Sequence, residues 1–154
     1  MINTILAATD RSEHARKAVA LAADLAEKYG AKLVLTHVAH PKQLTYEAIH
    51  AARVEHLINT AGDRLTRDQE TQVLMALGQE VLREAKARVH NVGEVVTRLE
   101  EGDPAKRILE CAKAEGADMI VIGSRGLNTL QGLMLGSVSH KVAQLAPCTC
   151  ITVK

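Results

Sequence analysis

Residues 118–139 read DMIVIGSRGLNTLQGLMLGSVS. The stretch opens with Asp118 to Ile122, the most apolar strand-like run of the chain, and passes through a glycine-rich segment into a helix that we expect over Ser139 to Leu145. Pro147 stops this helix, because proline cannot continue one. A buried strand that leads through glycines into a helix is typical of a parallel α/β sheet.

The same alternation of strand and helix runs through the rest of the chain. Gly30 and Gly116 each end a helix, because glycine accepts the left-handed conformation after a last helical turn, and Asp103 with Pro104 begins one. We therefore predict an α/β fold, a doubly wound parallel sheet of five strands with helices on both faces. The other expected strands are Ile2 to Ala8, Lys32 to Val38, Glu94 to Leu99 and Cys148 to Val153. Three other helices are expected: one that ends at Tyr29, one from Gln72 to Val89 and one from Pro104 to about Ala114.

One domain accounts for residues 1–154, since ordinary domains have ~100–200 residues. Residues 40–67 form a variable surface segment within it, where apolar residues stand among charges. This pattern predicts a second short helix and a loop around Gly62. Disorder of part of the segment is the alternative.

Composition and charge exclude several classes of partner. The chain has 19 Lys and Arg against 18 Asp and Glu, two Tyr, and neither Phe nor Trp. Nucleic-acid binding needs clustered basic residues and favours aromatic side chains for stacking, so we expect no nucleic-acid partner. No run of ~18 apolar residues is free of charge and no leader precedes the first strand, which predicts a cytoplasmic protein with no membrane insertion.

The glycine-rich segment has the features of a phosphate site. Gly123, Gly126 and Gly136 would let the main chain approach an oxyanion, and the following helix directs its positive dipole end at the same place. Arg125 would add a charged donor, and Ser137 and Ser139 supply hydroxyl groups. The alternative is that the glycines only make a long flexible turn.

Several stretches together resemble the universal stress protein family. The ATP-binding branch of this family has the motif G-2x-G-9x-G-[ST], which Gly123, Gly126, Gly136 and Ser137 match. The resemblance covers the whole chain. Its other matches are residues 8–12 (ATDRS) after the first strand, His37-Val38 at the end of the second, the helix start Gly102-Asp103-Pro104, and the strand from Asp118 to Gly123.

The resemblance implies the strand order 3-2-1-4-5 and a nucleotide at the carboxyl ends of strands one and four. Asp10 would approach the ribose or the metal and phosphate region, and Val38 would meet adenine through its backbone. The ligand would be ATP or another adenine nucleotide, with Mg or Mn carried by the nucleotide. The residues that would surround the phosphates are Gly123, Arg125, Gly126, Gly136, Ser137, Val138 and Ser139.

Asp10 also has a structural interpretation. With Glu13 three residues later it resembles a reciprocal helix cap, and Ser12 could cap the helix instead. A capping role and a ligand role are compatible.

The function that the resemblance implies is that of a nucleotide-responsive regulatory dimer in the stress response, with unknown protein clients. The first alternative is a slow ATPase or autophosphorylating enzyme; no P-loop or dedicated catalytic motif is present, and we expect no catalytic residues. The second is a dimeric adaptor that binds no nucleotide. In the family's strand order Cys148 to Val153 is an apolar edge, which favours a homodimer through this strand, unless residues 40–67 cover it.

The cysteines and histidines predict no metal site. Cys148 and Cys150 lie at alternate positions of one strand, and no further suitably spaced ligands complete a set, so they are interpreted with Cys111 as small buried hydrophobic residues. His37 is expected to line the nucleotide crevice. Five further histidines are predicted on helix surfaces: His14, His50, His56, His90 and His140.

Overall fold

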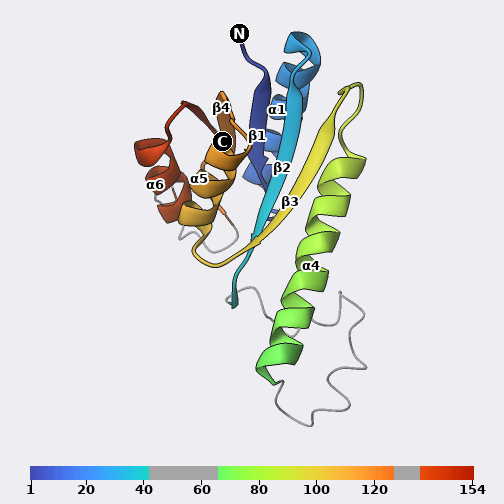
Figure 1. Ribbon diagram of the computed structural model, residues 1–154, viewed down its shortest axis with the longest axis vertical. Helices are drawn as coiled ribbons and strands as arrows, with labels where there is room; N and C mark the ends of the chain where they lie inside the picture. Colours follow the sequence, from blue (N-terminus) through green and yellow to red (C-terminus); the bar gives the residue numbers. More distant parts are fainter. Residues whose placement is uncertain (42–65, 127–135) are drawn as a thin grey trace.

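The computed structural model describes residues 1–41, 66–126 and 136–154 (Figure 1). Within these ranges strands and helices alternate along the chain, as predicted. The elements are β1 (Thr4–Ala8), α1 (Glu13–Tyr29), β2 (Lys32–Ala39), α4 (Arg67–Ala87), β3 (Val95–Glu101), α5 (Pro104–Ala114), β4 (Met119–Gly123), α6 (Ser137–Leu145) and β5 (Thr149–Val153).

The strands form one five-stranded parallel sheet in the order β3-β2-β1-β4-β5, which confirms the expected order. β1 lies at the centre, and the direction of winding reverses between β1 and β4. In sheets of this kind ligands bind beyond the carboxyl ends of the strands at the reversal. The fold therefore creates a crevice between the turn after β1 and the loop after β4.

Helices cover both faces of the sheet because alternate strand residues point to opposite sides. Leu33 and Leu35 of β2 belong to the core that packs under α1 and α4, whereas Val34 and Val38 belong to the core under α5 and α6. Figure 1 shows α5 and α6 on one side of the sheet and α4 on the other. β1 and β4 are buried along their whole length, which agrees with their continuous apolar sequences.

The predicted helix signals act at three ends. Gly30 follows α1 in the left-handed conformation, with φ 63°, and Gly116 follows α5 with φ 62°. The Asp103 side chain accepts the Lys106 N–H at 2.9 Å, and Pro104 is the first residue of α5. These residues were identifiable because their conformations and capping bonds are local.

Other boundaries were wrong by a few residues. The predicted helix from Gln72 to Val89 is α4, which begins at Arg67 and ends at Ala87, because Thr66 and Gln69 form a reciprocal capping box at its start. α6 begins at Ser137 rather than Ser139, with Gly136 as its N-cap. β3, β4 and β5 each start one residue later than predicted.

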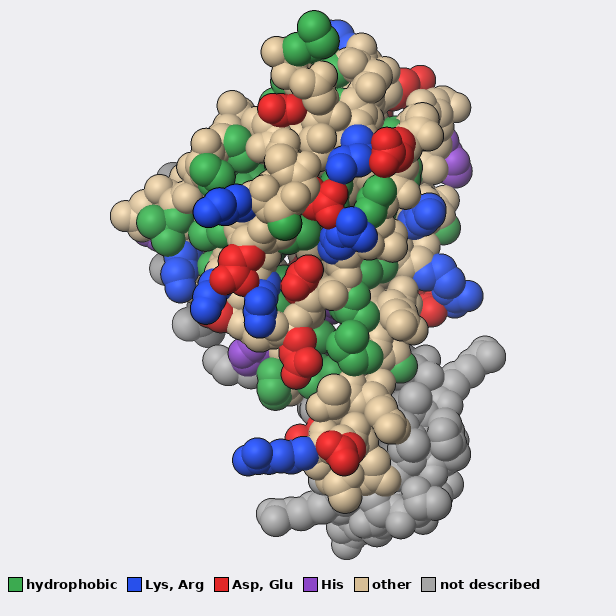
Figure 2. Space-filling view, in the orientation of Figure 1, with side chains coloured by type: hydrophobic (Ala, Val, Ile, Leu, Met, Phe, Trp, Pro, Cys, Tyr) green, Lys and Arg blue, Asp and Glu red, His purple; other side chains and the backbone are tan. Residues whose placement is uncertain are grey.

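Most of the variable segment, with its predicted helix and the loop around Gly62, lies outside the described residues. In the ranges that the structure does describe, no helix is both long and apolar enough to cross a membrane. Figure 2 shows Lys and Arg side chains interspersed with Asp and Glu side chains on the face in view, with no extended area of one charge. This mixture agrees with the net charge of +1.

Candidate functional site

A cavity of about 400 Å³ lies where the carboxyl ends of β1, β2 and β4 meet the starts of α5 and α6. This volume is in the range of ~300–1,000 Å³ that small-molecule sites occupy. Every residue predicted for nucleotide binding lines it: Asp10, Val38, Gly123, Arg125, Gly126, Gly136, Ser137, Val138 and Ser139. The structure thus brings together residues that are up to 129 positions apart because parallel strands end at one edge of the sheet.

The turn after β1 places Asp10 at the cavity. Its Oδ1 accepts the Ser12 N–H at 3.0 Å, while the Ser12 hydroxyl accepts the Ala15 N–H at 3.2 Å and caps α1. The interpretation of Asp10 and Glu13 as the reciprocal cap is therefore wrong, since Ser12 is the N-cap. Asp10 instead orders the turn with one carboxylate oxygen.

The second oxygen of Asp10 faces the loop after β4. A Cβ added to Gly126 would lie 2.7 Å from Asp10 Oδ2, which is closer than real Cβ atoms approach an oxygen. Gly126 thus allows the carboxylate to lie directly against the loop backbone. The turn after β1 and the glycine motif therefore lie in direct contact at one site.

Gly123 meets a different constraint. A Cβ at this position would lie 2.7 Å from the Ala15 N and 2.8 Å from the His14 carbonyl carbon, both in the first turn of α1. The missing side chain allows α1 to pack against the end of β4. Close helix packing, rather than an oxyanion alone, accounts for glycine here.

The start of α6 directs backbone donors at the cavity. Gly136 is the N-cap and has no side chain with which to cap the helix, and Ser137, Val138 and Ser139 follow it along the cavity wall. The first N–H groups of a helix have no acceptor within it, and the helix dipole makes this end positive. The start of α6 thus lies on the same cavity as Gly123 and Gly126, and phosphate binding by these backbone groups stays a prediction.

The Ser139 hydroxyl is committed to the protein interior. Ser139 is 2% exposed, and its Oγ lies 2.8 Å from the Ser124 carbonyl and 3.0 Å from the Gly136 carbonyl. Since both neighbours only accept hydrogen bonds, the hydroxyl hydrogen is donated to one of them. Ser139 thus fixes the helix start, whereas Ser137 is exposed beside the cavity.

Ser124 was missed by the sequence analysis. It is fully buried; its carbonyl accepts the Gly136 N–H at 2.6 Å, and its N–H donates to the Val153 carbonyl at 2.7 Å. Its hydroxyl lies 2.9 Å from Nδ1 of His14, so this partly exposed histidine of α1, predicted on a helix surface, also contacts the residue after β4. Ser124 therefore connects β4, β5, α1 and α6, and the available signal was its position inside the glycine motif.

The opposite end of the cavity is formed by β2 and α5. Val38, Thr36, Pro104 and Ile108 provide an apolar wall there. Thr36 was not predicted, and its buried hydroxyl has no hydrogen-bond partner within the described residues, although it lies close enough to Cys111 to moderate the pKa of that thiol. Burial nevertheless raises the pKa of Cys111, which is 4% exposed, as expected of a core cysteine.

His37 lies between the cavity and α4. Its Nδ1 lies 2.7 Å from the Thr9 carbonyl, and its Cδ2 would lie 3.1 Å from a Cβ at Gly78 of α4. The ring therefore lies beside α4, and His37 also lines the cavity, as predicted.

Asp103 forms part of the rim between α5 and α6. The Lys106 N–H, and secondarily Lys141, hold the pKa of its carboxyl below the usual range. Its Oδ1 lies 3.6 Å from Lys141 Nζ. The carboxylate thus stays charged at neutral pH and, with Asp10, places negative charge on two sides of the cavity.

Some of the remaining cysteines and histidines do not lie where they were predicted. Cys148 and Cys150 pack against the α5 and α6 core but are only partly buried, because β5 is an edge strand. His140 is exposed on α6, whereas His90 follows α4 instead of lying in it. His50 and His56 lie outside the described residues. Among the residues that are described, no three His, Cys, Asp or Glu side chains form a group able to hold a metal ion.

Comparisons with known proteins agree with this fold. Residues 1–154 match the model of the universal stress protein family. Universal stress protein YxiE of Bacillus subtilis is 34% identical over 157 residues, and a universal stress protein encoded in the QAH/OAS sulfhydrylase 3′ region of Thermus aquaticus is 36% identical over 154 residues, with 100% of each chain covered in both cases. A crystal structure of a universal stress protein in complex with cAMP is 28% identical, with a TM-score of 0.67 over 99% of this chain and 97% of that chain. The chain belongs to the universal stress protein family.

Proposed function

We propose that this protein binds ATP or another adenine nucleotide and acts as a nucleotide-responsive regulatory dimer in the cytoplasmic stress response. The observation that carries the proposal is that the glycine motif, the start of α6, Asp10 and Val38 line the same cavity. The related protein of known structure in complex with cAMP supports an adenine ligand.

In this proposal the phosphates lie against the loop after β4 and the first turn of α6. The N–H groups of Ser137 and Val138 donate to phosphate oxygens, and the Arg125 side chain adds a positive charge. Gly123, Gly126 and Gly136 keep side chains out of the phosphate path. Ser139 acts indirectly, because its hydroxyl holds the helix start.

The base would occupy the apolar end of the cavity. Adenine presents both a donor and an acceptor along one edge, which suits the backbone groups of an extended residue such as Val38. Pro104 and Ile108 would contact its faces.

Asp10 indicates which part of the nucleotide it meets. A carboxylate placed beside bare phosphates would repel them, so Asp10 either accepts from the ribose hydroxyls or shares a divalent cation with the phosphates. Asp10 supplies a carboxylate oxygen, the ligand type that Mg²⁺ prefers, and the nucleotide would supply the others. The cation therefore enters with the nucleotide in this proposal.

Binding is tested by native mass spectrometry of the protein purified without added nucleotide, followed by thermal denaturation with and without Mg-ATP. A ligand at ~100 times its Kd stabilises the folded state by ~2.7 kcal/mol, which shifts Tm by roughly 5–11 °C for a chain of this size. No bound adenylate and no shift with ATP, ADP or AMP would favour the adaptor function. Phosphate release over hours would favour slow hydrolysis.

The dimer is proposed to form through β5. β5 is an edge strand with Thr149 and Thr152 exposed, and Val153 accepts from the Ser124 N–H on the β4 side. Since neighbouring strand residues turn their backbone groups to opposite sides, Thr152 turns its N–H to the free edge. Thr152→Pro then removes no bond to β4 and should give a monomer by light scattering. A dimer that persists would place the interface elsewhere.

A further inference from the structure

Arg11 has an unusual backbone conformation directly beside the proposed site. Its φ is 68°, in the left-handed region that residues with a side chain seldom adopt. This conformation costs such a residue roughly a factor of 5 to 30 in population. It therefore persists only where neighbouring contacts hold it.

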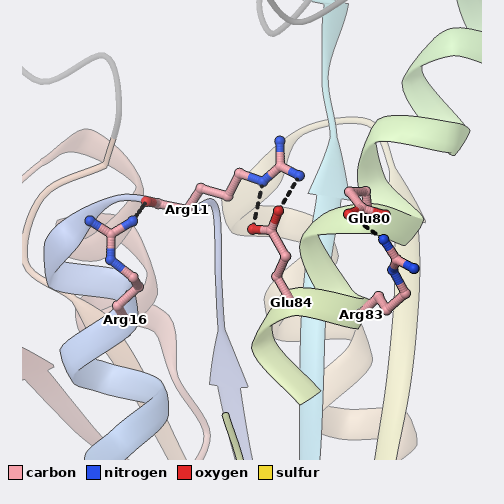
Figure 3. A network of polar contacts seen from close by, with 5 residues as sticks. All are labelled: Arg11, Arg16, Glu80, Arg83 and Glu84. Carbon is pink, nitrogen blue, oxygen red and sulfur yellow. Dashed lines mark hydrogen bonds and ion pairs between the residues drawn. The ribbon is translucent and has the colours of Figure 1, made fainter. Parts of the chain in front are cut away.

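Contacts from two helices hold Arg11 (Figure 3). Its Nε and Nη2 donate to the two carboxylate oxygens of Glu84 on α4, at 3.0 and 2.8 Å, and its carbonyl accepts from Arg16 Nη1 at 2.6 Å. A two-pronged arginine–carboxylate pair is the geometry in which a partly exposed ion pair contributes measurably to stability. The pair therefore offsets part of the backbone cost.

Arg11 and Asp10 face different sides of the same turn. Asp10 lines the large cavity, whereas Arg11 lines, with Glu84, a small hollow of about 30 Å³ on the α4 side. The bond from the Ser12 N–H to Asp10 Oδ1 spans Arg11, so the position of the carboxylate depends on the Arg11 backbone. A change at Glu84 would thus alter the position of the Asp10 carboxylate without any contact between Glu84 and the ligand.

We propose that Arg11 and Glu84 form a positioning pair through which α4 fixes the Asp10 carboxylate in the nucleotide cavity. The proposal rests on the proposed function for its ligand and on the geometry of the turn for its mechanism. Without the pair, Arg11 relaxes towards negative φ in part of the population, and the apparent Kd rises by the inverse of the fraction that remains competent.

Four variants test the pair by calorimetric titration with Mg-ATP. Glu84→Gln should weaken binding about threefold, whereas Glu80→Gln should not, because Glu80 lies one turn earlier on α4 and pairs with Arg83 of the same helix. Arg11→Ala should bind at least ~5 times more weakly than Arg11→Gly, since glycine adopts positive φ freely. A direct electrostatic role of the guanidinium would instead make the Ala and Gly variants equal, and would overturn the proposal.

A second measurement needs no nucleotide. Hydrogen exchange of the Ser12 amide should be faster in Glu84→Gln and Arg11→Ala than in the wild type and in Glu80→Gln, because this amide is held by Asp10. If the wild type binds no adenylate but Ser12 responds in this way, the proposed function fails and the positioning pair stands. Unchanged Ser12 exchange in Glu84→Gln would overturn the pair whatever the nucleotide result.

Discussion

Gly126→Ala directly perturbs the contact between Asp10 and the loop after β4. The new Cβ would lie 2.7 Å from Asp10 Oδ2, and ordinary van der Waals contact begins at 3.4 Å, so the carboxylate or the loop must retreat by about 0.7 Å. Such a movement disturbs the bond from the Ser12 N–H to Asp10. A hydrogen bond to a charged group contributes ~1.5–3 kcal/mol, so we expect Mg-ATP to bind roughly 10- to 100-fold more weakly.

The assay is calorimetric titration of Gly126→Ala beside Gly30→Ala. Gly30 has φ 63° and open space around its Cα, so alanine there strains the backbone by ~1 kcal/mol away from the cavity. We expect Gly30→Ala to lose stability but keep its nucleotide affinity, whereas Gly126→Ala should lose nucleotide affinity in addition to any loss of stability. Wild-type affinity in Gly126→Ala would refute the assignment of Asp10 and this loop to one site.

Three further predictions concern stability. Thr36→Val should raise the free energy of unfolding of the nucleotide-free protein by ~1 kcal/mol in urea, because it removes a buried hydroxyl that, within the described residues, has no hydrogen-bond partner and only lies near the Cys111 thiol; a loss would show that the hydroxyl is satisfied. Ser139→Ala should lower the free energy of unfolding by ~1 kcal/mol, whereas Ser137→Ala should leave it unchanged. Equal effects of the two substitutions would contradict the interior role of Ser139. The N–H groups of Asn3 and Thr4 hold the pKa of Asp118 below its usual range. The Asp118 carboxylate therefore stabilises the folded state fully above the unfolded-state pKa of ~3.9, and this stabilisation is lost as pH falls through the lower folded-state pKa. The Tm advantage of the wild type over Asp118→Asn should therefore shrink below about pH 4 and not above it; a constant difference would exclude this linkage.

The parts of the fold that the sequence predicted have local signals. Gly30, Asp103 and Pro104 mark helix ends through their own conformations, and buried strands with the expected order bring Asp10 and Gly123 to neighbouring ends of β1 and β4. The resemblance supplied the strand order and the site residues, which share one cavity.

Tertiary contacts account for what the sequence could not predict. Ser139 bonds to a carbonyl fifteen positions away, and His14 meets Ser124 across 110 positions, so neither partner is visible in a local pattern. The reason for glycine at 123 is likewise the passage of α1 beside it. The pair of Arg11 and Glu84 also joins segments that only the fold brings together.

The most direct test of the account is a crystal structure of the protein grown with Mg-ATP. We expect the triphosphate within hydrogen-bonding distance of the Ser137 and Val138 N–H groups, with adenine against Val38 and Asp10 on the ribose or the cation. A nucleotide bound elsewhere, or a cavity filled by the protein's own side chains under saturating Mg-ATP, would contradict the account.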